Sequence, residues 1–230
     1  MDSPSVFLSY PVMIAPEMTS FMSMQKAIAT CGYPVMFQLE VGDSFITRVR
    51  NNHVSRFLAG DWTHYVTWDS DLVFYPTAGC ANPIKKLVEN NLEFCGALYA
   101  CKDAKIRRVA SNRGKYGDSP IVPICHESGH HKFRWLGGGM WCVRRDAIVR
   151  MAEHYPELEY GGTNGEDFTI HGLFNPFICE NILLSEDWSF CERFLNTPGC
   201  GVPFADTSIV LGHVGKREFF VWGEPVDAII

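Results

Sequence analysis

The sequence lacks the marks of a secreted, membrane-spanning or dedicated nucleic-acid-binding protein. No apolar run approaches the ~20 residues of a membrane-spanning helix, and the Met1–Pro4 start has no basic stretch of a secretory signal. Lys and Arg number 20 against 26 Asp and Glu, a net charge of −6, which makes a nucleic-acid partner unlikely. The nine cysteines form no CxxC pair and are odd in number, which predicts free thiols in a reducing, cytoplasmic compartment.

What is present indicates a single globular α/β domain over residues 1–230. Hydrophobic residues make up 47% of the chain and charged residues 20%, which is typical of a folded protein with a sizeable core. The alternation of apolar runs with helical periodicity predicts a mostly parallel mixed sheet with helices on both faces. Ligands of such sheets bind beyond the carboxyl ends of the strands. The predicted strands are 6–12, 35–39, 64–68 and 94–99, and the helices are 19–31, 43–58 and 82–89, with N-caps at Asp43 and Asn82.

The second half of the chain begins after a long basic stretch. Residues 102–132 carry seven Lys or Arg against three Asp or Glu and show no periodicity, which predicts a surface loop. Further on we expect a helix to about Ala152, a helix from a Ser185 N-cap to Phe194, and strands at 210–214 and 219–222.

Two acidic residues follow the third predicted strand directly. Asp69 and Asp71 flank Ser70 in a DxD pattern, and hard oxygen ligands in low number suit Mg²⁺ or Mn²⁺ that also binds substrate phosphates. Solvated carboxylates at the exit of a strand are the alternative. His213 lies between two glycines near Lys216; as a nitrogen ligand it would favour Mn²⁺, although an isolated histidine is often purely structural.

Two acidic pairs compete as the source of a general base. Glu186 and Asp187 open a predicted helix, where carboxylates also complement the helix dipole. Glu166 and Asp167 form the second pair. The triple glycine at 137–139 is not a phosphate-binding P-loop; it is a plain turn or a place where backbone approaches a sugar. Its flanking residues Trp135 and Trp141 belong to the core or form a stacking platform for a sugar.

These pieces together resemble GT-A type nucleotide-sugar glycosyltransferases of the family-2-like kind found in bacteria, phages and large viruses. The resemblance covers nearly the whole chain, and each piece is short, but their order matches that of the family. It is carried by Tyr10-Pro11-Val12, residues 47–52, the DxD segment 67–74, residues 99–102, Gly137–Met140, the xED-like segment 184–191 and Leu211-Gly212-His213.

The resemblance implies a donor half at 1–100, an acceptor and catalytic half at 134–230, and a set of site residues. The nucleotide and donor sugar would lie against Pro11, Val12, Glu40, Arg48, Asn52, Asp69, Ser70, Lys102, Gly138, Gly139 and Lys216. Asp71 and His213 would bind Mn²⁺ or Mg²⁺, with Asp69 on the ribose, the metal or a metal-bound water. Asp187, beside Glu186, would deprotonate the acceptor.

The expected activity is therefore metal-dependent transfer of a sugar from a UDP- or GDP-sugar to a glycan or another hydroxyl compound, with inversion at the anomeric carbon. Two alternatives are a sugar-phosphate nucleotidyltransferase and a non-catalytic interaction module on the same fold. The segment after the first strand, residues 10–17, lacks the Gly-rich, basic composition that nucleotidyltransferases usually carry there.

Overall fold

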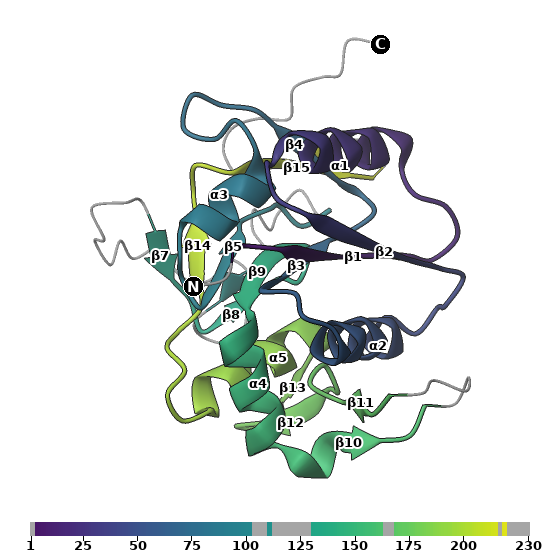
Figure 1. Ribbon diagram of the computed structural model, residues 1–230, viewed down its shortest axis with the longest axis vertical. Helices are drawn as coiled ribbons and strands as arrows, with labels where there is room; N and C mark the ends of the chain where they lie inside the picture. Colours follow the sequence, from purple (N-terminus) through teal and green to yellow (C-terminus); the bar gives the residue numbers. More distant parts are fainter. Residues whose placement is uncertain (1–2, 103–109, 112–129, 163–167, 216–217, 220–230) are drawn as a thin grey trace.

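A computed structural model describes residues 3–102, 110–111, 130–162, 168–215 and 218–219 of the chain. Its centre is a seven-stranded mixed sheet with the strand order β2-β1-β3-β9-β5-β14-β7 (Figure 1). Strands β2, β1, β3, β5 and β14 run in one direction, and β9 and β7 run against them. The bounds are β1 Val6–Val12, β2 Val35–Val41, β3 His64–Trp68, β5 Phe94–Ala97, β7 His130–Lys132, β9 Met140–Arg144 and β14 Phe204–Asp206.

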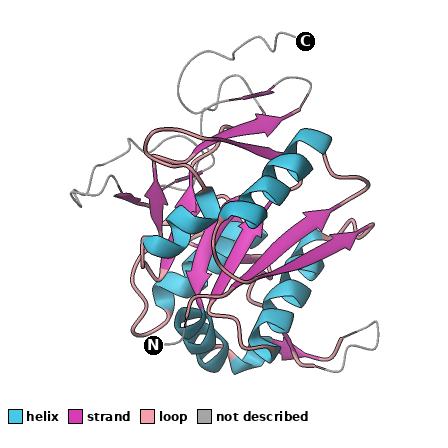
Figure 2. Cartoon of the chain, turned by 45° about the horizontal axis from the view of Figure 1, so that its top comes forward, coloured by secondary structure: helices cyan, strands magenta, loops and turns pink. Residues whose placement is uncertain are grey.

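Helices cover both faces of this sheet, as the sequence predicts. On one face α1 (Met18–Thr30) and α3 (Pro83–Glu89) pack on an apolar core. On the other face α2 (Ile46–Ala59), α4 (Arg145–His154) and α5 (Glu186–Asn196) enclose a second core. Figure 2 shows the helices on either side of the strands. The predicted α/β class, with a mostly parallel mixed sheet, is therefore confirmed.

Most predicted elements are found within a few residues of their expected bounds. The expected N-cap of α2 is wrong, because that helix begins at Ile46 after Phe45. The Asp43 carboxylate instead accepts a hydrogen bond from the Phe45 backbone amide at 2.8 Å and pairs with Arg48. Asn82 does cap α3, since its side chain accepts from the Lys85 amide at 3.0 Å.

The DxD residues form a turn between two strands of different sheets, and the strand after the turn, β4, is not among the predicted elements. Strand β3 ends at Trp68, and β4 (Leu72–Tyr75) begins after the acidic turn. Strand β4 pairs antiparallel with β15 (Val210–Val214), which pairs with β16 (Glu218–Phe219). In this register His213 lies opposite Leu72, so the histidine reaches the turn from a strand about 140 residues further along the chain.

Smaller elements complete the described chain. They are β6 Ala110–Ser111, β8 Trp135–Leu136, η1 Pro156–Leu158, β10 Glu159–Tyr160, β11 Ile170–His171, β12 Phe177–Cys179 and β13 Ile182–Leu184. Most of the predicted loop at 102–132 lies outside the described residues, as does the predicted strand beyond Phe219. Within the described part of the chain, no helix combines the length and apolar character that crossing a bilayer requires.

Candidate functional site

The acidic turn at 69–71 is held in place by backbone contacts from two sides. The Asp69 amide donates to the Gly139 carbonyl at 2.8 Å, which ties the turn to the start of β9. On the other side, the Glu17 amide donates to the Ser70 carbonyl at 3.0 Å, just before α1 begins. The backbone of the turn is thus fixed by its neighbours, and its side chains stand at the carboxyl edge of the sheet.

Asp71 and His213 form the part of the site best suited to a cation. His213 Nε2 lies 3.4 Å from Asp71 Oδ2, and its other ring nitrogen, Nδ1, lies 2.7 Å from the Ala100 carbonyl. A carbonyl only accepts, so Nδ1 carries the hydrogen and Nε2 presents a lone pair toward Asp71 when the ring is neutral. The ring of Tyr99 packs edge-on against the imidazole at 5.2 Å. The tautomer and the orientation of His213 are therefore both set.

The same Asp71 oxygen also binds an ammonium group. Lys102 Nζ lies 2.5 Å from Asp71 Oδ2. Burial raises the pKa of Asp71, but a hydrogen bond and charge from the His213 ring when that ring is protonated, together with those from Lys102, outweigh it, so the pKa is lowered. A carboxylate with a lowered pKa beside a histidine lone pair is a donor set that fits Mn²⁺ or Mg²⁺. The described residues contain no group of three such ligands, so substrate oxygens or water would complete the shell.

Asp69 faces a different partner, which sequence reasoning missed. Arg50, on α2, donates from Nη2 to Asp69 Oδ1 at 2.8 Å, and its Nη1 lies 3.9 Å from Glu186 Oε1. Only 4% of the Arg50 side chain is exposed. Burial opposes its charge, but Asp69, Glu186 and Asp187 keep the pKa of Arg50 above its usual value. The sequence did contain a sign of this role, because Arg50 lies among the buried residues of α2, where a charged side chain needs a partner of opposite charge.

Asp187 is buried at the start of α5 and is held by three donors. Oδ2 accepts from the Gly138 amide at 3.0 Å, and Oδ1 accepts from the Trp188 amide at 2.8 Å and from the Ser185 hydroxyl. Burial and the neighbouring charge of Glu186 raise the pKa of Asp187 to about 6. Since a carboxylate offers about four lone-pair positions, one acceptor position is left for a substrate proton.

Ser185 lies at the predicted N-cap position, but its side chain does not cap the helix. Ser185 is the N-cap residue of α5, which puts Glu186 and Asp187 in the first turn, as expected. Its hydroxyl makes no capping bond to the helix backbone and is used on the Asp187 carboxylate instead. The residue thus orients the acidic side chain rather than stabilising the helix end.

The glycines at 138 and 139 provide space for other side chains. A Cβ on Gly138 would stand 1.6 Å from Arg50 Nη1, and one on Gly139 would stand 2.6 Å from Leu72 Cδ1. Their amides donate within the protein, Gly138 to Asp187 and Gly139 to the Tyr99 hydroxyl. Contact of these glycines with a donor sugar stays a prediction.

The tryptophans beside the triple glycine belong to the core. Trp135 is 2% exposed and stacks on Trp188 with ring centroids 4.8 Å apart, and Trp141 is fully buried. The interpretation of these two residues as a sugar-stacking platform is therefore wrong, because neither ring faces solvent.

Three of the residues expected at the nucleotide, Pro11, Val12 and Glu40, lie at the ends of β1 and β2. Pro11 and Val12 are the last residues of β1, and Pro11 pairs in register with Glu40 of β2. The Glu40 carboxylate lies 3.2 Å from Nε2 of the buried His53. A hollow of about 550 Å³ opens beside the acidic turn; its lining residues are Met13, Ile14, Ala15, Pro16, Glu17, Met18, Ser70 and Asp71.

Arg48 and Asn52 lie elsewhere on the surface of α2. Both line a separate hollow of about 180 Å³, together with Tyr160 and Asn175, and none of the residues 69–71 lines it. Arg48 is paired with Asp43 at 2.6 Å. Lys216 and the acidic pair at 166–167 lie outside the described residues.

Comparisons with known proteins identify the fold of the chain but not its family or activity. No protein-family model matches the chain, and no curated protein matches it. The chain is similar to A197 from STIV, with 10% identity, 97% of both chains covered and a TM-score of 0.55. At that identity the likeness shows a shared fold alone.

Two weaker likenesses are to enzymes, and they carry no argument of their own. One is a glycosyltransferase involved in the glycosylation of the major capsid of PBCV-1, at 14% identity, with 64% of this chain and 62% of that chain covered and a TM-score of 0.36. The other is described as a glucose-1-phosphate thymidylyltransferase from Bacillus anthracis, at 12% identity, with 65% and 74% covered and a TM-score of 0.38.

Proposed function

We propose that this protein is a metal-dependent glycosyltransferase that uses a nucleoside-diphosphate sugar. The observation that carries the proposal is the pairing of Asp71 with an oriented His213 at 3.4 Å, at the carboxyl edge of the sheet, with a buried acidic cluster next to it. Arg50 links that cluster to the acidic turn through Asp69 and Glu186. One region thus combines a candidate cation site with a candidate base.

Asp71 and His213 would hold the ion, and Lys102 supplies a positive charge to the same place when no ion is bound. A divalent ion bound there supplies Lewis-acid stabilisation of the diphosphate that leaves the donor. The nucleoside would lie in the hollow between the segment 13–18 and the acidic turn. Pro11 and Glu40 pair in register near the ends of β1 and β2, and the segment that lines the hollow begins one residue after β1 ends.

Asp187 is the group proposed to take the acceptor proton. A base with a pKa of about 6 is ionised at neutral pH and still basic enough to accept a proton in the transition state. As the acceptor hydroxyl loses its proton to Asp187, its oxygen bonds to the anomeric carbon and the anomeric carbon–phosphate oxygen bond breaks. Attack opposite to the leaving group gives inversion. Arg50 keeps the surrounding carboxylates in position during this charge movement.

Turnover of a panel of UDP- and GDP-sugars tests the proposal. Release of nucleoside diphosphate is measured with Mn²⁺, with Mg²⁺ and with EDTA, and we expect it to require the ion. Asp71→Asn and His213→Ala should abolish this release. Asp61→Asn is a matched control, because Asp61 is exposed and lies outside the residues of the candidate site.

Two results would contradict the proposal. Release of pyrophosphate from a nucleoside triphosphate and a sugar phosphate would identify a nucleotidyltransferase. Absence of nucleotide binding to the folded protein, in calorimetric titrations with UDP and GDP in the presence of Mn²⁺, would identify a non-catalytic module.

A further inference from the structure

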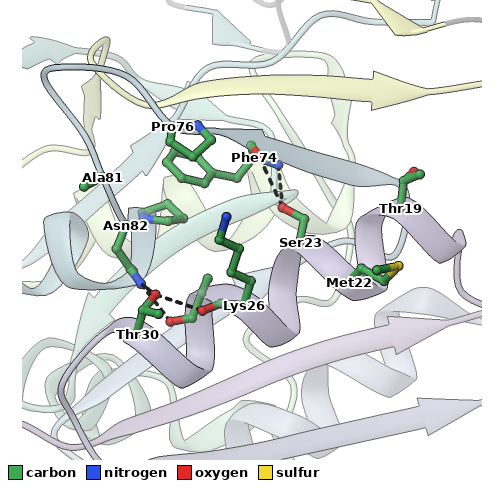
Figure 3. A pocket seen from close by; sticks show the side chains of 11 residues that line it. Thr19, Met22, Ser23, Lys26, Thr30, Phe74, Pro76, Ala81 and Asn82 are labelled. Atoms are coloured by element: carbon green, nitrogen blue, oxygen red, sulfur yellow. Dashed lines mark hydrogen bonds between the residues drawn. The ribbon is translucent and has the colours of Figure 1, made fainter.

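A pocket of about 410 Å³ lies between α1, the segment that follows β4, and the start of α3 (Figure 3). It shares no lining residue with the candidate site. Its walls are mainly apolar and include Met22, Ala27, Phe74, Pro76 and Pro83. Two of these residues are prolines, whose fixed backbone gives rigid walls. The volume is within the range of pockets that bind small organic ligands.

The neutral polar groups around the pocket already have partners inside the protein. The Ser23 hydroxyl accepts from the Phe74 amide at 3.0 Å. The Asn82 side-chain amide donates to the Ala27 carbonyl and to the Thr30 hydroxyl, both at 2.8 Å. These groups therefore shape the wall and place no demand for a hydrogen-bonding ligand.

Lys26 is the one charged residue among the described residues that line the pocket. Figure 3 shows its side chain rising from α1 into the pocket, between Ser23 and Asn82. No described acidic residue forms an ion pair with its ammonium group, and α1 contains no Asp or Glu. The Glu17 carboxylate, just before the start of α1, accepts a hydrogen bond from the Thr19 amide and does not line the pocket. Lys26 is solvent-exposed, so it lies at the rim of the pocket with no ion-pair partner among the described residues. An apolar pocket with such a cation at its rim favours a ligand that has an apolar body and a negative group.

We propose that this pocket binds a medium-chain aliphatic carboxylate. Its hydrocarbon chain would lie among Met22, Phe74 and Pro76, where burial of apolar surface provides most of the affinity. Its carboxylate would accept charge-assisted hydrogen bonds from Lys26. Met22 is flexible and polarisable, so its side chain can adjust to the thickness of the chain. The site is independent of the proposed transferase activity.

Binding of octanoate to the full chain tests the proposal, with octanol and octylamine as probes of charge. Spectra of the protein with ¹³C-labelled methionine methyls should show a shift of the Met22 signal on titration with octanoate. Met151, which is buried in the core on the opposite face of the sheet, serves as the internal control. Lys26→Met should weaken octanoate about tenfold, the worth of one charged hydrogen bond, and leave octanol unchanged.

Two filling variants locate the site. Ala27→Phe places a ring inside the pocket, and Ala81→Phe places one at its exposed rim, where folding is least at risk. In each variant, octanoate should no longer shift the Met22 signal. If Ala27→Phe does not fold, the result with Ala81→Phe tests the location of the site. The proposal is overturned if octanoate leaves Met22 unmoved, if octanol or octylamine binds as tightly as octanoate, or if octanoate still binds to the filled, folded protein.

Discussion

Replacement of Arg50 by methionine is the most informative single perturbation of the candidate site. The side chain is buried and lies against three carboxylates, of which Asp69 is in direct contact at 2.8 Å. Methionine fills similar space but carries no charge, so the acidic side chains remain while their counter-ion is lost. We therefore expect Arg50→Met to fold with a large loss of stability at neutral pH.

The structure sets the size of that loss. Removal of one partner from a buried ion pair typically costs ~3–5 kcal/mol. The Asp69 side chain is 26% exposed, so water screens part of its charge and the lower end, about 3 kcal/mol, applies. For a chain of this length each kcal/mol lowers the Tm by ~2–4 °C, so we expect a decrease of ~6–12 °C.

The loss should depend on pH with a definite sign. The pKa values of Asp69 and Asp187 are raised already in the native protein, that of Asp187 to about 6. Without Arg50 these two pKa values rise further. When the pKa of a carboxyl group is higher in the folded than in the unfolded state, the free energy of unfolding falls as the pH rises through the folded-state pKa. The difference between Arg50→Met and the native protein should therefore be small at pH 5 and largest at pH 7.5.

Urea denaturation at both pH values, with Tm as a second measure, checks these expectations. Arg56→Met is the matched control on the same helix: Arg56 is exposed and contacts only the Phe168 ring at 5.6 Å among the interactions described for it. Its loss should cost less than ~1 kcal/mol. The reasoning is refuted if Arg50→Met is as stable as the control at pH 7.5, or if its deficit is equal or greater at pH 5.

Four further predictions concern the same region. Asp187→Asn should lower kcat by ~10²-fold or more with little change in UDP affinity, and Glu186→Gln should have a milder effect, as measured by turnover beside calorimetry; equal losses would contradict the assignment of the base. Native activity should fall as pH decreases through about 6, where Asp187 takes up a proton, and a flat pH profile of kcat would contradict this. His213→Ala should remove the effect of Mn²⁺ on UDP affinity, and an unchanged EDTA response in calorimetry would disprove the metal site. Gly138→Ala should destabilise the protein, because the new Cβ would stand 1.6 Å from Arg50 Nη1; an unchanged urea midpoint would show that Arg50 can move away freely.

Local patterns were enough to predict most elements of the first hundred residues, but not the separate strand β4. Apolar runs, glycine stops and the Asn82-Pro83 start of α3 are encoded within a few residues, so they can be recognised without knowledge of the fold. The α2 start was misplaced because Asp43 has the chemistry of an N-cap, but its carboxylate is bound to Arg48 and to a loop amide. Local sequence alone does not distinguish an aspartate that caps a helix from one that is paired with a nearby arginine.

The candidate site was predicted only in part, because its contacts join distant segments. The family resemblance assigned Asp71 and His213 to one metal site, but nothing in the local sequence brings the two residues together. The antiparallel register of β4 with β15 places them 3.4 Å apart. Asp187 was named from its motif, but its burial and its pKa of about 6 depend on the Gly138 amide and on Glu186.

By itself, the sequence determined the α/β class, the strand that leads into the acidic turn and the helix that begins at Glu186, because each depends on neighbouring residues. Tertiary structure alone decided that Arg50 joins Asp69 to Glu186, and that Gly138 must lack a side chain to leave room for that arginine. It also decided the role of Trp135 and Trp141, which are suitable for stacking on a sugar but are enclosed by the core. Burial and proximity arise from the packing of segments far apart in the chain, and a local pattern carries no information on either.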